Sequence, residues 1–229
     1  MSRRKARTKR TLFFDPRLGT TGRYTNTKGQ IVSVDVVQAG IEQQIESSAQ
    51  IMGSAAKRFH EGKINIAELQ IAMKDEMKLL HTRCAAIAKG GWKQMSQADW
   101  GSVGQITRIQ YKTLENFMAE IANGDYKISK LDGSINGQFL QRVDLYAEAG
   151  NGTAKEIERR QAKLNGLTHE RRILDPAAKH CGCCLSQAAL NWQLFGILKR
   201  LGECDCRSRD RCHFIFGAER NGKISEGKR

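Results

Sequence analysis

Residues 65–91 read NIAELQIAMKDEMKLLHTRCAAIAKGG, and this stretch decides the fold class. Asn65 followed three residues later by Glu68 is a capping-box start for a helix. Two glycines, at positions 90 and 91, end the pattern. Between them, apolar side chains recur every three or four residues, which places them on one helical face: Ile66, Leu69, Met73, Met77, Leu80, Cys84 and Ile87. The pattern predicts an amphipathic helix that buries Cys84 as a small core residue.

Three further stretches have the same character. Ser33 is placed to cap a stripe that runs from Val37 to Phe59, and Ser96 to cap one that ends before residue 123. A fourth helix begins between residues 134 and 136, and we expect the glycines at 150 and 152 to kink or divide it. His60, His81 and His169 are isolated in sequence and are interpreted as cap or surface groups.

The sequence therefore predicts a mainly α protein: a helical body with a short N-terminal β piece and a small cysteine-rich C-terminal module. The β piece is RYTNTKGQIVS at residues 23–33, which is typical of a hairpin or an extended lead-in. We divide the chain into a basic arm (1–22), a helical body (23–168), a cysteine-rich module (169–217) and a basic tail (218–229).

Charge indicates the kind of partner. The 229 residues carry a formal net charge of +14, which favours a polyanion or an acidic protein surface. The arm is the most basic part and holds no acid before residue 15. We expect it to contact nucleic acid or an acidic groove through six side chains: Arg3, Arg4, Lys5, Arg7, Lys9 and Arg10. The alternative is a solvated tail.

The cellular compartment is inferred from the lack of a membrane span and of a signal peptide in the sequence. The longest apolar runs are far shorter than the ~20 residues of a membrane-spanning helix, so no membrane contact is expected. The basic start lacks the apolar core of a signal peptide. We therefore expect folding in a reducing cytosol, where disulfides rarely persist.

Six of the seven cysteines fall within residues 181–212. Cys181 and Cys184 form a C-x-x-C, a spacing that points two thiolates at one ion from a tight turn. A second group follows about twenty residues later, which is the usual plan of a tetrahedral structural zinc site. The preferred ligands are Cys181, Cys184, Cys206 and Cys212, with Cys204, His180 and His213 as alternates. Disulfides or free thiols remain open.

We find no catalytic constellation. The zinc-deaminase pattern is not met, and the chain has no P-loop, no G-x-S-x-G and no H-E-x-x-H. The sequence therefore predicts a protein that is not an enzyme.

The C-terminal stretch LDPAAKHCGCCLSQAALNWQLFGILKRLGECDCRSRDRCHFIF resembles the signature of phage head morphogenesis proteins, the Mu F-like minor head group. Cys181 and Cys184 match the first cysteine pair of that group, Cys206 and Cys212 fit the last pair, and HFIF fits its closing strand. The helical body is also similar, in RYTNTKGQIVS, AKGGW and NGQFLQRVDLYAEA. The family's His-Pro before the final cysteines is missing, and Asp205 stands where Arg is usual.

The resemblance implies a structural role in the virion, as a minor component near the capsid or portal. Expected partners are capsid or portal proteins and packaged DNA, with several copies per particle, made in the host cytoplasm. The alternative is a cytosolic zinc-containing protein that binds nucleic acid through phosphate contacts.

Overall fold

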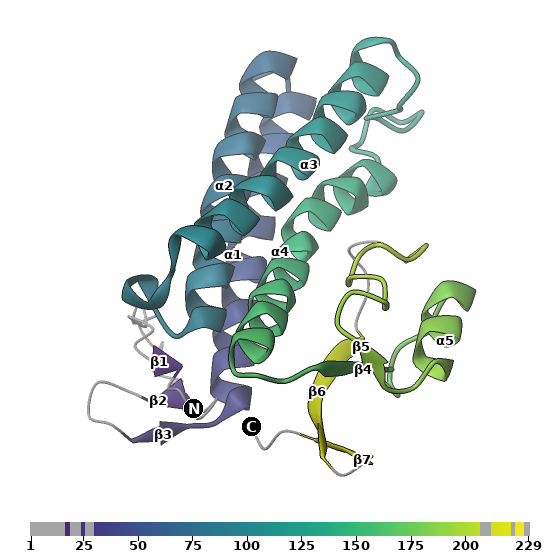
Figure 1. Ribbon diagram of the computed structural model, residues 1–229. Coiled ribbons are helices and arrows are strands. Elements are labelled where there is room, and N and C mark those ends of the chain that lie inside the picture. The colour runs from purple at the N-terminus through teal and green to yellow at the C-terminus, as the bar shows by residue number, and fades with distance from the viewer. Residues whose placement is uncertain (1–16, 19–23, 26–29, 207–211, 221–222, 227–229) are drawn as a thin grey trace, which may run out of the picture.

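A computed structural model describes residues 17–18, 24–25, 30–206, 212–220 and 223–226 of the chain. Its body consists of four long helices: α1 (Val34–His60), α2 (Ile66–Lys89), α3 (Gln97–Ala122) and α4 (Gly137–Leu164). Helix α2 packs against the other three, and α1 also packs along α4, whereas α3 and α4 touch only sparingly (Figure 1). The expected mainly α fold class is confirmed.

Local capping sets the helix boundaries. Ser33 accepts a hydrogen bond from the backbone N–H of Val36, and Asn65 and Ser96 each form a capping box. Asn136 caps α4. Gly90 ends α2 in the left-handed conformation, at φ 86°, which glycine adopts without strain.

Helix α4 corrects one part of an expectation, because Gly150 and Gly152 do not divide it and it continues from Gly137 to Leu164. A Cβ atom on Gly150 would lie 3.0 Å from the Sγ of Cys84 and from a methyl of Leu80, both on α2. The missing side chain therefore lets the two helices approach closely. Packing against α2 outweighs the local cost of a glycine in the helix.

His81 is the second correction. It is fully buried rather than a cap or surface group, and its Nδ1 lies 2.7 Å from the Oγ1 of Thr153 on α4. Its position one turn after Met77 places it on the apolar face of α2. Cys84, one turn further along, is buried as predicted.

Three short antiparallel strands precede α1: β1 (Arg17–Leu18), β2 (Tyr24–Thr25) and β3 (Ile31–Val32), in that order. The predicted hairpin is confirmed by the pairing of β2 with β3. Tyr24 fixes this sheet to the body, because its hydroxyl donates a 2.7 Å hydrogen bond to the carbonyl of Ala88 at the end of α2.

The C-terminal module follows α4. It contains β4 (His169–Ile173), α5 (Gly182–Ala189), β5 (Gln193–Leu194), β6 (His213–Arg220) and β7 (Lys223–Glu226), with the sheet order β5-β4-β6-β7. Its strands lie beside the C-terminal end of α4 (Figure 1). The boundary placed at residue 217 falls inside β6, and β7 pairs with β6 within the segment that the sequence assigned to a tail.

Only some of the apolar side chains of the module form its small core. Leu198, Phe214 and Phe216 are buried against Ala162 of α4. By contrast, Leu194 and Ile197 are more than half exposed. Among the described residues, no helix is both long and apolar enough to cross a membrane.

Candidate metal centre

The cysteines converge because two turns of the module face each other. Cys181 is the N-cap of α5, so Cys183 and Cys184 lie in its first turn. The chain then returns through residues 199–206 and brings Cys204 and Cys206 back to the same place. Cys184 and Cys204 are buried and pack with the other cysteines of the module in one cluster.

Three sulfur atoms lie close enough to share one ion. The Sγ atoms of Cys181, Cys184 and Cys204 are all within 4.8 Å of one another, and the Sγ of Cys206 is 3.4 Å from that of Cys184. Zinc–sulfur bonds of about 2.3 Å in a tetrahedron place the sulfurs about 3.8 Å apart. The observed spacing is compatible with this value, so the group can hold a metal ion.

Cys204 belongs to a second pairing as well. Its sulfur lies within disulfide-bonding distance of the sulfur of Cys183. A sulfur in a disulfide is no longer an anionic thiolate, which is the form that binds metal. Cys204 can therefore serve either the ion or the disulfide at one time.

Cys212 and His180 form a separate pair within the same cluster. The Nε2 of His180 lies 2.7 Å from the carbonyl oxygen of Asp175, which can only accept a hydrogen bond, so that nitrogen carries the proton. The Nδ1 then offers its lone pair, and the Sγ of Cys212 is 3.7 Å away. His213 begins β6 and lines, with Cys212, a groove next to α1 and α4.

Among the described residues, Arg172 is a cation that contacts two sulfurs of the cysteine cluster. Its side chain is buried, and Nη1 donates to the sulfurs of Cys184 at 3.4 Å and of Cys204 at 3.1 Å. Nη2 donates to the carbonyls of Lys199 and Arg200. A guanidinium stays charged when buried, so negative charge beside it is strongly favoured.

Local geometry acts in the same direction at Cys181. The backbone N–H of Cys184 donates to its Sγ at 3.4 Å, and this contact at the start of α5 lowers the pKa of Cys181 to about 7. Cys84 behaves in the opposite way, because burial in the helical body raises its pKa to about 12. Cys84 is therefore chemically distinct from Cys181.

A buried ion pair fastens the module to the body. Arg159 of α4 forms a two-pronged contact with Glu170 of β4, donates to the carbonyl of Leu198 and lies over the ring of Phe214. Glu170 also accepts from the backbone N–H of Gly196. Because Arg172 lies over the same ring, Phe214 connects this junction to the thiol group.

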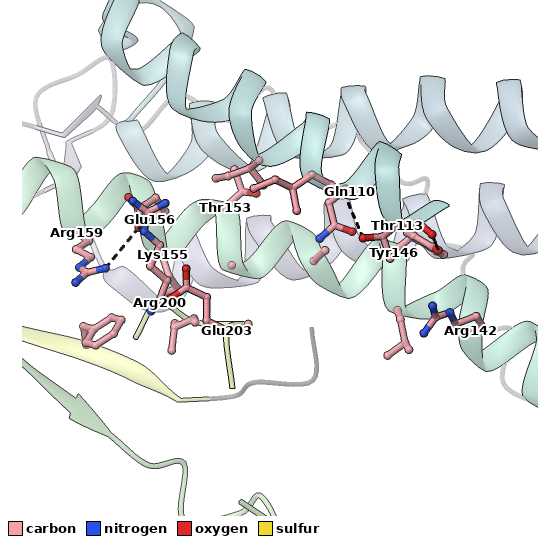
Figure 2. Close-up of a pocket in the computed structure, with 18 residues that line it drawn as sticks. Gln110, Thr113, Arg142, Tyr146, Thr153, Lys155, Glu156, Arg159, Arg200 and Glu203 are labelled. Carbon is pink, nitrogen blue, oxygen red and sulfur yellow. Dashed lines mark hydrogen bonds and ion pairs between the residues drawn. The ribbon is translucent and has the colours of Figure 1, made fainter. Parts of the chain in front are cut away.

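A pocket of about 490 Å³ opens beside this junction, between α3, α4 and residues 200–203. Figure 2 shows Arg159 paired with Glu156 at one end, and Tyr146 donating to the Thr113 carbonyl at the other. No cysteine lines the pocket, so it is separate from the thiol group.

The structure brings together three of the seven ligand candidates from the sequence, Cys181, Cys184 and Cys204, and places Cys206 in contact with them. Cys212 lies beside His180 instead. The sequence did not predict that Glu170 and Arg172 are buried, because the charged residues of β4, HERRI at 169–173, suggest a solvent-exposed strand. The one available signal was strand alternation, which puts both on the same face. The arm residues that were expected to bind polyanions lie outside the described residues.

Searches of known protein families, curated proteins and solved structures found no match to this chain.

Proposed function

We propose that this chain is a structural minor component of a tailed-phage head, and that a zinc ion cross-links the two turns of its C-terminal module. Cys181, Cys184, Cys204 and Cys206 would be the ligands. The observation that carries the metal centre is the convergence of these four sulfurs next to the buried guanidinium of Arg172. Four thiolates and one zinc ion leave two negative charges, which a buried cation stabilises.

The size of the module supports a role for a cross-link within it. Its apolar core, with Leu198, Phe214 and Phe216 as its buried members, is small for an independent fold. Modules of this kind gain stability from metal or disulfide links, since buried apolar surface alone does not offset the entropy of ordering the chain. Structural zinc contributes folding free energy directly.

Placement in a phage head is supported by the C-terminal resemblance and by the architecture around it. A helical body that ends in a cross-linked module suits a component held by protein contacts within a particle. The net charge of +14 suits a position next to packaged DNA or an acidic portal surface.

Metal analysis tests the centre. Reduced, tag-free protein should contain about one zinc ion per chain. Cys204→Ser should lose most of it, whereas Cys84→Ala, a buried cysteine outside the module, should retain it. Retention in Cys204→Ser together with loss in Cys212→Ser would restore the ligand set preferred from the sequence. Absence of metal in every form would leave a disulfide as the link.

Particle analysis tests the biological role. Mass spectrometry of purified procapsids and mature heads should find the protein in both, in fixed proportion to the portal protein. Its absence from both would refute the head assignment. In that case, salt-dependent binding of the intact protein to duplex DNA would favour the nucleic-acid-binding alternative.

A further inference from the structure

Cys183 is the one cysteine of the module that is neither a proposed metal ligand nor the partner of His180. It is half-buried in the first turn of α5, and the Nζ of Lys199 is 3.7 Å from its sulfur. Cys204, its neighbour, is almost fully buried, at 3% exposure. A reagent from solution therefore has a more direct path to Cys183 than to Cys204.

We propose that Cys183 is a thiol–disulfide exchange site that competes with the metal ion for Cys204. This inference rests on the metal centre proposed above. The external reactant is a low-molecular-weight disulfide, and the product is a Cys183–Cys204 disulfide with the ion released or bound more weakly.

The chemistry balances in two exchange steps. The Cys183 thiolate attacks one sulfur of the small disulfide, forms a mixed disulfide and expels one small thiolate. The Cys204 thiolate leaves the metal ion and attacks the Cys183 sulfur of that mixed disulfide, which expels the second small thiolate. The two protein thiolates lose two electrons, and the small disulfide gains them.

The geometry makes this pair the favoured one. The structure pairs Cys183 with Cys204 inside the cysteine cluster, so the product of the second step fits the fold of the module. After it, Cys181, Cys184 and Cys206 remain as three thiols. An ion held by three thiolates has an open position, which water or a competing chelator can occupy.

The exchange would connect the module to its surroundings. In a reducing cytosol Cys204 stays a thiolate and the metal centre is complete. In a particle outside the cell, small disulfides convert the link from metal to disulfide. The module would stay cross-linked in both settings.

The test uses full-length protein that is loaded with zinc, reduced and freed of reductant. Glutathione disulfide is added in steps, zinc release is followed with a metal indicator dye, and disulfides are mapped after the remaining thiols are alkylated. We expect Cys183–Cys204 to form first and zinc release to follow it. Cys183→Ser should release zinc about tenfold more slowly, because one of the thiolates that would hold the ion must then react first. Cys84→Ala should match the native protein.

Equal release from Cys183→Ser and native protein would refute the exchange site, and so would a first disulfide between two of the remaining thiols. A reduced protein that holds no zinc would instead refute the metal centre itself. In that case a mapped Cys183–Cys204 bond would show a structural disulfide without competition.

Discussion

Acidification should destabilise the helical body through His81. The side chain is fully buried between α2 and α4, its Nδ1 pairs with Thr153, and its Nε2 has no hydrogen-bond partner among the described residues. Burial lowers the pKa of His81 from 6.5 to about 4, because the charged imidazolium loses its hydration. The unfolded chain therefore binds this proton more readily than the folded one.

The sign and size follow from linkage. A histidine whose folded pKa is lowered contributes full stability above its unfolded pKa and loses it as pH falls toward the folded value. Between about pH 7.5 and about pH 5, the free energy of unfolding should fall by ~2 kcal/mol from this residue alone. Cys181, whose pKa is about 7, and Glu156, whose pKa is raised by burial, also titrate near this range, so the His81 contribution is isolated by comparison with a variant.

Urea unfolding at the two pH values measures the effect. His81→Phe combined with Thr153→Val removes both partners of the buried hydrogen bond, so it leaves no orphaned hydroxyl. The double variant should lose about 2 kcal/mol less than the native protein on acidification, whatever its absolute stability. Equal losses in the two proteins would refute the assignment of the pH dependence to His81.

Two further predictions use matched variants. Gly150→Ala should destabilise the protein by about 1 kcal/mol in thermal unfolding, because the new methyl group meets Leu80 at 3.0 Å. Gly104→Ala, whose methyl group meets nothing within 4 Å, should stabilise the protein by about as much. Stabilisation by both would mean that α2 yields easily at this contact. Arg172→Met should weaken zinc binding about 10- to 100-fold in competition with a chelator, since it removes the cation beside the thiolates, while Arg171→Met on the other face of β4 should not. Equal affinities would remove Arg172 from the centre.

The helical fold could be predicted from the sequence because its signals are local. Ser33, Asn65, Ser96 and Asn136 cap the helices within three residues of themselves. Apolar spacing assigns a face to each helix without reference to its neighbours. The same locality explains the error at Gly150, where the deciding contact comes from α2, about seventy residues earlier in the chain.

The thiol site could be predicted only in part. The C-x-x-C of Cys181 and Cys184 is a local pattern, and the structure keeps the two together at the start of α5. The choice between Cys204 and Cys212 for the third place depends on how the returning loop lies against that helix. Spacing along the chain does not encode this geometry.

By itself, then, the sequence determined the helix boundaries, the cysteine-rich module and its capacity for metal, because capping, periodicity and residue type act over a few residues. Only the tertiary structure decided that His81 is buried, that Arg172 lies against the sulfurs and that Cys204 joins them. Each of these depends on segments far apart in the chain that meet in a water-poor interior. There, a buried charge or polar group must find a partner to offset the cost of its burial, and residue type alone does not determine which partner that is.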